Sequence, residues 1–182
     1  MSLPAYFGPN PHHCPSQRLA MQLLTHRQIE AKVTRLAMEI LEHNTEENEL
    51  YILGVNNRGM ELARRLTKGL RTLSDAPLHL WNLRIDPREP LAGGPELDHD
   101  VSELNGKPVL VVDDVANTGR TLFYALGALH TVLPSKIEVA VLVDRRHKEW
   151  PIYVTYSGLV LSTTLGDNIL VEFGTEDTAL LQ

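Results

Sequence analysis

Apolar residues recur at helical spacing in three parts of the chain. Between Ile29 and Leu41 they return every three or four positions, which predicts an amphipathic helix over residues 25–44. Thr25 and Gln28 stand at the spacing of a capping box, in which two side chains satisfy backbone N–H groups at the start of a helix. The sequence therefore predicts helices over residues 25–44, 59–70 and 119–132.

Short continuous apolar runs separate these helical stretches. Runs of this kind are typical of strands that are buried on both faces of a sheet. Because strands and helices alternate, the sequence predicts an α/β fold with a mostly parallel central sheet and helices on both of its faces. The expected strands cover residues 50–55, 78–85, 109–112 and 137–143.

Three other segments lack this alternation. Residues 1–24 contain four prolines and no sustained period, so we expect an extended N-terminal arm before a single domain over residues 25–182. Residues 86–106 are rich in Gly, Pro and Asp, and a loop of this length in a compact domain is typical of a functional flap. Short strand-like pieces over residues 151–173 predict a small antiparallel cap.

Composition narrows the class of protein. With 182 residues and 43% hydrophobic content, the chain can bury a sizeable core, and its one cysteine, Cys14, excludes an internal disulfide. No apolar run is long enough to cross a membrane and no signal-like start is present, so we expect a soluble, cytoplasmic protein. His12 and His13 lie beside Cys14, but three adjacent side chains rarely complete a metal site, so no metal is expected there. The net charge of −6 disfavours a general nucleic-acid-binding surface, while a local basic patch is compatible with it.

The most informative segment runs from residue 109 to residue 121. A buried strand ends in Asp113 and Asp114, and a short loop leads through Thr118 to Thr121 at the start of a helix. Sites in parallel sheets lie outside the carboxyl ends of the strands. Backbone N–H groups and the two threonine hydroxyls can surround a phosphate, while the two carboxylates accept hydrogen bonds from vicinal ribose hydroxyls. The spacing favours a sugar-phosphate site.

Other protein classes also place two acids at the end of a strand. Receiver domains and metal-dependent phosphatases do so, and Thr118-Gly119-Arg120 could be only the first turn of a helix. Neither the dinucleotide-binding glycine pattern nor the Walker pattern of P-loop proteins is present. Receiver-domain function gives no role to residues 54–59 or to the expected cap.

Residues 109–121 resemble the phosphoribosyl-diphosphate signature of type I phosphoribosyltransferases: an apolar strand, two aspartates, then Thr-Gly-x-Thr. Residues 54–59, Gly-Val-Asn-Asn-Arg-Gly, resemble the pyrophosphate loop of the same family. Residues 142–152 resemble a strand of one subfamily, the pyrimidine-operon attenuator/uracil phosphoribosyltransferase proteins, that ends in Val-Asp-Arg-Gly-His-Arg-Glu-Leu-Pro-Ile. The resemblance covers about residues 25–173 and implies the type I phosphoribosyltransferase fold.

The resemblance implies transfer of the 5-phosphoribosyl group from phosphoribosyl diphosphate to a nucleobase. Asp113 and Asp114 would hold the ribose hydroxyls, directly or through Mg²⁺, and Arg58 would hold the pyrophosphate, so these three are the expected catalytic residues. Dimers are common in the family, so a homodimer is expected. The cradle for phosphoribosyl diphosphate would comprise Asn56, Asn57, Gly59, Val115, Ala116, Asn117, Thr118, Gly119, Arg120 and Thr121. The nucleobase or nucleotide would contact Val143, Asp144, Arg145 and Tyr156 under the cap.

Asn117 bears on the choice of base. Purine-salvage relatives carry an aspartate immediately before Thr-Gly, where it can take a proton from the purine. A neutral amide cannot act as a general base near neutral pH. Uracil is therefore the favoured acceptor.

Several positions depart from the subfamily or have a second interpretation. Residues 81–86 differ from its acidic-aromatic run and the following loop looks shorter, so Arg84 and Arg88 are open candidates for reaching the leaving group. Tyr153, like Tyr156, could stack on a base or simply pack, and His147 is better explained as a surface or structural histidine. Family members often have a non-proline cis peptide in the pyrophosphate loop, here near Asn56 and Asn57.

Two alternatives to catalysis stay open. Relatives in the subfamily bind pyrimidine-operon messenger RNA, which 17 Lys and Arg against 23 Asp and Glu disfavour here. Local basic groups, around Lys32 and Arg35 or around Arg145 and Lys148, could still form one RNA-binding face. A degenerate member would sense phosphoribosyl diphosphate or a nucleotide without turning it over.

Overall fold

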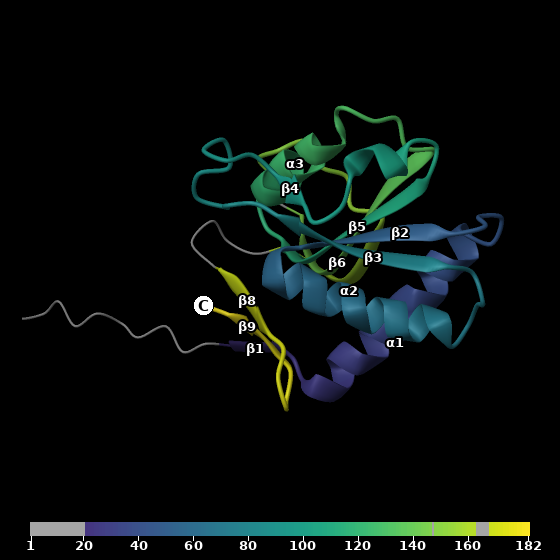
Figure 1. Cartoon of the computed structure of the whole chain (residues 1–182). Helices are drawn as coiled ribbons and strands as arrows, with labels where there is room; N and C mark the ends of the chain where they lie inside the picture. The colour runs from purple at the N-terminus through teal and green to yellow at the C-terminus, as the bar shows by residue number, and fades with distance from the viewer. Residues whose placement is uncertain (1–20, 147, 163–167) are drawn as a thin grey trace, which may run out of the picture.

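A computed structural model describes residues 21–146, 148–162 and 168–182 of the chain (Figure 1). The expected arm up to residue 20, with His12, His13 and Cys14, lies outside the described residues, and so does His147. None of the helices within the described ranges has the length and apolarity to span a bilayer.

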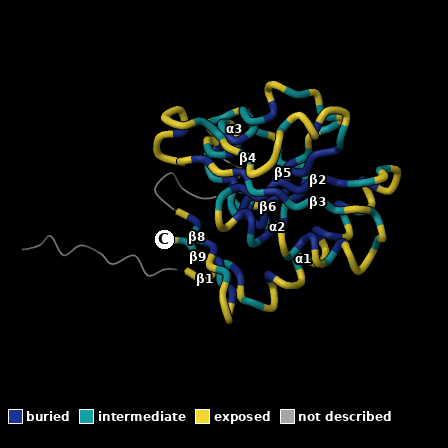
Figure 2. The backbone as a smooth tube through the Cα atoms, in the orientation of Figure 1, coloured by how far each residue is buried: buried dark blue, intermediate teal, exposed yellow. Residues whose placement is uncertain are grey.

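A six-stranded sheet forms the centre of the molecule, as the alternation of strands and helices predicts. Its strand order is β4-β3-β2-β5-β6-β7, and all neighbours are parallel except β4, which pairs antiparallel with β3 at one edge. The middle strands are the darkest part of Figure 2, because apolar layers cover both of their faces. The strands are β2 (Leu50–Val55), β3 (Leu78–Arg84), β4 (Glu96–Leu97), β5 (Pro108–Ala116), β6 (Lys136–Arg145) and β7 (Tyr156–Leu161).

Helices cover both faces of this sheet (Figure 1). On one face lie α1 (His26–His43) and α2 (Asn56–Arg71); on the other lie α3 (Arg120–Ala125) and the short 3₁₀ turns η1 (Val101–Leu104) and η2 (Leu126–Leu129). Thr25 and Gln28 form the predicted capping box at the start of α1. The helix predicted over residues 119–132 is shorter than expected, because its second half becomes the 3₁₀ turn η2.

A second, three-stranded antiparallel sheet, called the hood below, has the order β1-β9-β8. It consists of β1 (Met21–Leu24), β8 (Ile169–Glu172) and β9 (Thr178–Leu181). The expected antiparallel cap is present, but its residues differ from the expected range 151–173 in two respects. Residues 21–24, which we assigned to the arm, belong to the hood, and residues 156–161 form β7, which joins the main sheet in parallel to β6. Both pairings join distant segments, which the local pattern does not reveal.

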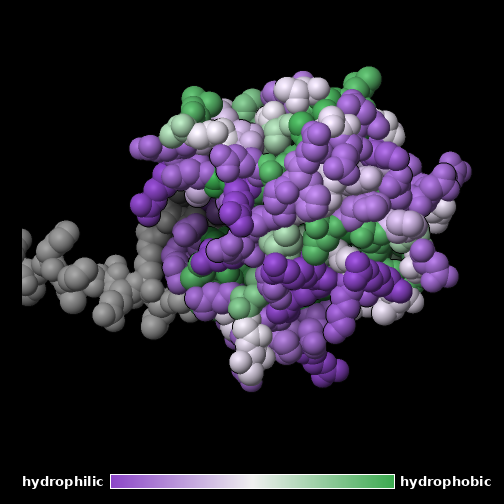
Figure 3. Space-filling view, viewed as in Figure 1, coloured by the Kyte–Doolittle hydropathy of each residue, from purple (hydrophilic) through white to green (hydrophobic). Residues whose placement is uncertain are grey.

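Asp177 ties the hood to the helices beneath it. Its buried carboxylate accepts hydrogen bonds from two guanidinium nitrogens of Arg65 in α2 and from the Gly174 N–H at 3.0 Å. The same carboxylate lies 3.1 Å from Nδ1 of His26 in α1. Burial alone would raise the pKa of the Asp177 carboxyl, but the hydrogen bonds from Arg65 and Gly174 outweigh burial and lower it. The Asp177 carboxylate thus adds a charged link to the apolar contacts that Ile169, Val171 and Ala179 of the hood make with the core. Most of the face seen in Figure 3 is hydrophilic, with apolar patches between the polar residues.

Candidate active site

The acid pair lies at the carboxyl end of β5, in the middle of the sheet. The strand continues past the predicted end at Val112 to Ala116, because β6 pairs with it through Val115 and Ala116. Asp113 is only 7% exposed, and its Oδ1 accepts a hydrogen bond from the Asp114 N–H at 2.9 Å. The two carboxylates therefore occupy the edge of the sheet where ligands bind in parallel α/β folds.

Two glycines bring the start of α2 against this pair. A Cβ on Gly59 would lie 2.5 Å from the Val112 carbonyl oxygen and 3.0 Å from the Asp113 Cα, and a Cβ on Gly54 would lie 2.5 Å from the Met60 Cα. Real Cβ atoms do not approach backbone so closely, so only glycine at these positions allows α2 to begin beside the acids.

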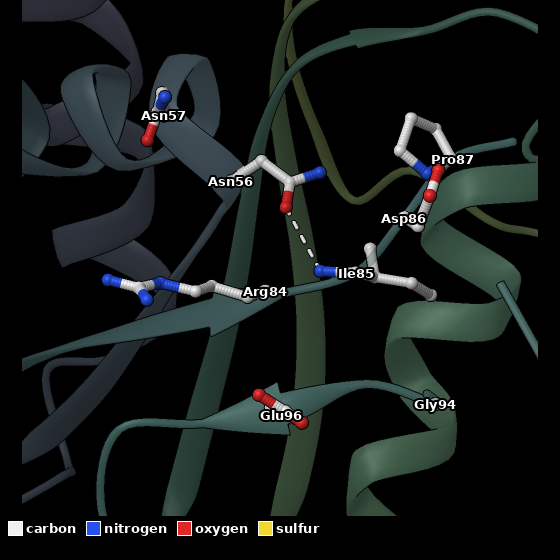
Figure 4. A pocket seen from close by; sticks show the side chains of 8 residues that line it. All are labelled: Asn56, Asn57, Arg84, Ile85, Asp86, Pro87, Gly94 and Glu96. Carbon is white, nitrogen blue, oxygen red and sulfur yellow. Dashed lines mark hydrogen bonds between the residues drawn. The ribbon is translucent and has the colours of Figure 1, made fainter. Parts of the chain in front are cut away.

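Asn56 makes the turn between β2 and α2. It adopts a left-handed conformation with φ of 52°, which asparagine tolerates better than most residues, and its Oδ1 accepts a hydrogen bond from the Ile85 N–H at 3.0 Å (Figure 4). The described residues contain no cis peptide bond, so the cis peptide expected near Asn56 and Asn57 is not found. The turn begins α2 three residues before the predicted start at Gly59.

Burial and mutual repulsion disfavour the ionised form of the acid pair. Burial, and then the neighbouring Asp114 charge, raise the pKa of the Asp113 carboxyl well above its usual range. Burial also raises the pKa of the Asp114 carboxyl, while the Arg58 guanidinium opposes both shifts only in part. Hydroxyl donors or a cation at this position would relieve the excess negative charge.

The raised pKa values predict that the acid pair lowers stability at neutral pH. Asp113→Asn keeps an acceptor oxygen for the Asp114 N–H and removes the buried charge, so we expect the free energy of unfolding to rise by about 1 kcal/mol in metal-free buffer. A carboxyl whose pKa is raised by folding destabilises the folded state fully above its folded pKa and not at all below its unfolded value of about 3.9. The difference in melting temperature between variant and parent should therefore shrink as the pH falls from about 8 to about 4. A difference that grows in acid contradicts this assignment.

The phosphate loop, defined here as residues 116–121, follows the acids. Gly119 has φ of 86°, in the left-handed region, and α3 begins at Arg120 immediately after it. The Thr118 hydroxyl oxygen accepts a hydrogen bond from the Arg120 N–H at 3.3 Å. A left-handed residue next to a helical one makes successive backbone N–H groups converge, which suits an anion.

Two open cavities flank the start of α2, and Asn57 lines both of them. The first, about 440 Å³, lies between α2 and the segment after β3 (Figure 4) and is lined by Asn56, Asn57, Arg84, Ile85, Asp86, Pro87, Gly94 and Glu96. The second, about 620 Å³, lies between α2 and the hood and is lined by Asn57, Arg58, Glu61, Val171, Glu172, Phe173, Gly174 and Glu176. Arg58 and Arg84 thus line cavities on two sides of the expected pyrophosphate loop. Arg88 lies nearer α3, where its carbonyl oxygen accepts from Arg120 Nη2 at 3.4 Å.

The structure brings the backbone of three of the four expected base-contacting residues to this edge, although the Val143 side chain is buried in the core. Val143 and Asp144 pair with Val115 and Ala116 across the β5–β6 ladder, and Arg145 follows them at the end of β6.

Tyr156 is not brought to the site. It begins β7 opposite Ala140, is 1% exposed, and donates its hydroxyl hydrogen to Glu138 Oε1 at 2.8 Å. Burial, and then Glu138, raise the pKa of the Tyr156 hydroxyl. Tyr156 therefore packs the core, and Tyr153 is 82% exposed.

Sequence reasoning missed the contribution of Lys148, whose ammonium group contacts the phosphate loop at the Ala116 carbonyl oxygen. It also missed the wall that the hood gives to the second cavity beyond residue 173. The available signals were weak: Lys148 stands four residues after Asp144, and apolar residues alternate in β8 and β9.

Comparison with known proteins identifies the family of this chain. The family described as phosphoribosyl transferase domain matches residues 20–177. The chain belongs to this family. It is 34% identical to the bifunctional protein PyrR of Bacillus pumilus, with 85% of this chain and 91% of that protein covered. It is 37% identical to the bifunctional protein PyrR of Streptococcus uberis, with 77% and 82% covered, and 34% identical to the pyrimidine operon regulatory protein of Lactococcus lactis, with 80% and 85% covered.

Solved structures confirm the expected type I phosphoribosyltransferase fold. The crystal structure of the hypoxanthine phosphoribosyltransferase of Trypanosoma cruzi matches with a TM-score of 0.68 and 21% identity, covering 82% of this chain and 83% of the other. A hypoxanthine-guanine phosphoribosyltransferase of Bacillus anthracis matches with a TM-score of 0.64 and 22% identity, covering 78% and 82%.

Proposed function

We propose that this phosphoribosyltransferase moves the 5-phosphoribosyl group from phosphoribosyl diphosphate to uracil and releases pyrophosphate. The observation that carries the proposal is the meeting of three elements at one edge of the sheet. These are the acid pair on β5, the close-packed start of α2, and the phosphate loop before α3.

Each element has a role in holding the donor. Asp113 and Asp114 accept hydrogen bonds from the two ribose hydroxyls, the N–H groups of the phosphate loop hold the 5′-phosphate, and Arg58 with the backbone beside Asn57 holds the pyrophosphate. Because the pyrophosphate then lies at the start of α2, the two cavities beside Asn57 offer it space.

The acid pair also fits Mg²⁺. Carboxylate oxygens are suitable ligands, and a cation there would offset the burial and the mutual repulsion that raise the pKa values of the pair. The described residues hold no group of three metal-ligating side chains, so substrate oxygens and water would complete the coordination shell. When bound, Mg²⁺ would withdraw charge from the departing pyrophosphate.

The reaction needs positioning more than acid–base chemistry. The base nitrogen forms a bond to C1 of the ribose while the bond from C1 to the pyrophosphate oxygen breaks, and the nitrogen passes its proton to solvent water. Asn117, a neutral amide in the phosphate loop, cannot take that proton. The chain therefore contributes orientation of the donor and electrostatic stabilisation of the leaving group, and this favours a pyrimidine acceptor over a purine.

A second candidate function is regulation through RNA binding: the name of the Lactococcus lactis relative states a regulatory role, and the subfamily resemblance implies that RNA is the target. One observation favours it: Arg64, Lys68 and Arg71 are exposed and follow one another at helical spacing along α2. Such a stripe can neutralise phosphates locally in spite of the net charge of −6. Salt-dependent retention of RNA on filters, lost in an Arg64→Ala, Lys68→Ala variant, would support this candidate.

The proposed activity is tested by pyrophosphate release from phosphoribosyl diphosphate with Mg²⁺. Uracil, orotate, hypoxanthine, guanine, xanthine and adenine are offered separately. We expect release with uracil alone. Release with a purine would contradict the inference from Asn117, and silence with every base while phosphoribosyl diphosphate still binds would contradict transfer itself.

Arg58 is expected to act on the pyrophosphate and not on the base. Arg58→Ala should lower kcat/KM for phosphoribosyl diphosphate by about a hundredfold, because a guanidinium fork matches two phosphate oxygens. The KM for uracil should stay within about twofold, because the substitution leaves the end of β6 intact. Steady-state kinetics with each substrate varied measures both. Arg64→Ala, an exposed arginine two turns along the same helix, is the control and should leave both constants unchanged.

A further inference from the structure

Residues just after β6 hold the carbonyl groups of the phosphate loop. Lys148 Nζ donates to the Ala116 carbonyl oxygen at 2.9 Å. The Glu149 and Trp150 N–H groups both donate to the Thr118 carbonyl oxygen at 3.0 Å. Two of the loop's carbonyl groups are therefore turned toward these residues.

The direction of a carbonyl fixes the direction of the next N–H. In a planar trans peptide, the C=O of one residue and the N–H of the following residue point in opposite directions. With the Ala116 and Thr118 carbonyls held by Lys148, Glu149 and Trp150, the N–H groups of Asn117 and Gly119 point to the other side of the loop. The loop thus keeps carbonyl oxygens away from an anion and turns two donors toward it.

Lys148 acts on the anion through the loop and not by direct contact. Its ammonium group also donates to the Asp144 carboxylate and to the Arg145 carbonyl oxygen. A lysine ammonium has three N–H donors, and these three acceptors use all of them. The Lys148 side chain is 17% exposed and that of Asp144 is 19% exposed, so the pair is largely enclosed between the loop and β6.

Close packing supports the same role. A Cβ on Gly119 would lie 3.2 Å from the Trp150 carbonyl oxygen and 3.4 Å from the Lys148 Cδ. The phosphate loop therefore packs against the Lys148 side chain at Gly119. Gly119 is the residue whose left-handed backbone makes the N–H groups converge.

We propose that Lys148 is a positioning residue that orients the Asn117 and Gly119 N–H groups toward the 5′-phosphate, resting on the function proposed above. Its loss would free the Ala116 carbonyl and leave the Asp144 carboxylate without its cationic partner. The affinity for the 5′-phosphate should fall much more than the affinity for the nucleoside part, which Lys148 reaches only through Asp144 and Arg145.

Calorimetric binding of uridine 5′-monophosphate and of uridine separates these two parts. Lys148→Met should weaken binding of the nucleotide about tenfold, the effect of one or two charge-assisted hydrogen bonds, and weaken uridine binding by no more than about twofold. Lys148→Arg keeps a cationic donor and should restore most of the loss. Lys136→Met, at the first residue of the same strand, is the matched control and should bind both ligands as the parent does.

Ribose 5-phosphate gives a direct readout at the two N–H groups. In the parent protein it should shift the amide proton resonances of Asn117 and Gly119 downfield, and in Lys148→Met it should shift them less. Equal loss of nucleotide and nucleoside binding in Lys148→Met, or no loss of either, overturns the role of Lys148. Lys148→Gln replaces the methionine variant if that protein does not fold. A parent protein that binds the nucleotide no better than uridine overturns the proposed function instead, so the two failures are distinguishable.

Discussion

Replacing Asp113 and Asp114 together by asparagine should lower phosphoribosyl transfer by about a thousandfold or more, the scale of effect seen when preorganised electrostatic groups are removed from a reacting centre. Asparagine keeps the size of each side chain but removes the negative charge. That charge strengthens the hydrogen bonds accepted from the ribose hydroxyls and would bind Mg²⁺. Since both pKa values are raised in the folded protein, the variant should melt no lower than the parent. Initial rates and melting curves of the same preparation measure the two effects.

A matched control is available at the end of α1. Glu46 and Glu47 are also adjacent acids, but they lie in the turn between α1 and β2, away from the carboxyl edge of the sheet. Glu46→Gln with Glu47→Gln should leave the rate unchanged. Activity close to that of the parent in the Asp113, Asp114 variant would remove the acid pair from the mechanism.

Asp177→Asn should lower the free energy of unfolding by about 2 kcal/mol, because it removes the charge that accepts two hydrogen bonds from Arg65, which keeps Glu61 as an ion-pair partner. The carboxylate joins the hood to Arg65 and His26, so the variant loses one polar link to each helix, while the apolar contacts of the hood with both helices remain. Urea denaturation of the variant and of Glu176→Gln, an exposed neighbour in the same turn, measures the difference.

The pH dependence of this effect has a defined sign. Folding lowers the pKa of Asp177, so its stabilising contribution is present above the unfolded value of about 3.9 and is lost as the pH falls through the folded pKa. The difference in free energy of unfolding between parent and Asp177→Asn should therefore disappear in strong acid. The difference for Asp113→Asn should also shrink in acid, but there the variant is the more stable protein. A difference in free energy of unfolding that is the same at all pH values would mean that the ion pair does not stabilise the protein.

Elements with a strong local signal could be predicted from the sequence. The strand over residues 50–55 has the predicted bounds, since it is a continuous apolar run between polar segments. The Thr25 cap was predictable because its partner Gln28 lies three residues away. The start of α2 was not, because Asn56 turns the chain by adopting φ of 52°.

Pairings between distant segments could not be predicted. The sequence predicts that Tyr156 contacts the nucleobase, but parallel pairing of β7 with β6 places its ring in the core. The hood joins residues 21–24 to residues 178–181, and short strands of this kind carry too few residues for a periodic pattern.

The candidate site likewise contains a part that the sequence predicts and a part that it does not. The acid pair and the phosphate loop are contiguous in the sequence, so spacing alone placed them together. The contact from Lys148 to Ala116 spans 32 residues and that from Arg65 to Asp177 spans 112 residues. Nothing in the local sequence marks either lysine or arginine as the partner of these groups.

The central claim is that this chain forms a bond between a ribose carbon and a uracil nitrogen. Incubation with isotopically labelled uracil, phosphoribosyl diphosphate and Mg²⁺, followed by mass spectrometry, tests this claim most directly. We predict labelled uridine 5′-monophosphate and pyrophosphate in equal amounts, and neither product with the Asp113→Asn, Asp114→Asn variant. Pyrophosphate without labelled nucleotide, or labelled nucleotide from the variant at the parent rate, would contradict the account.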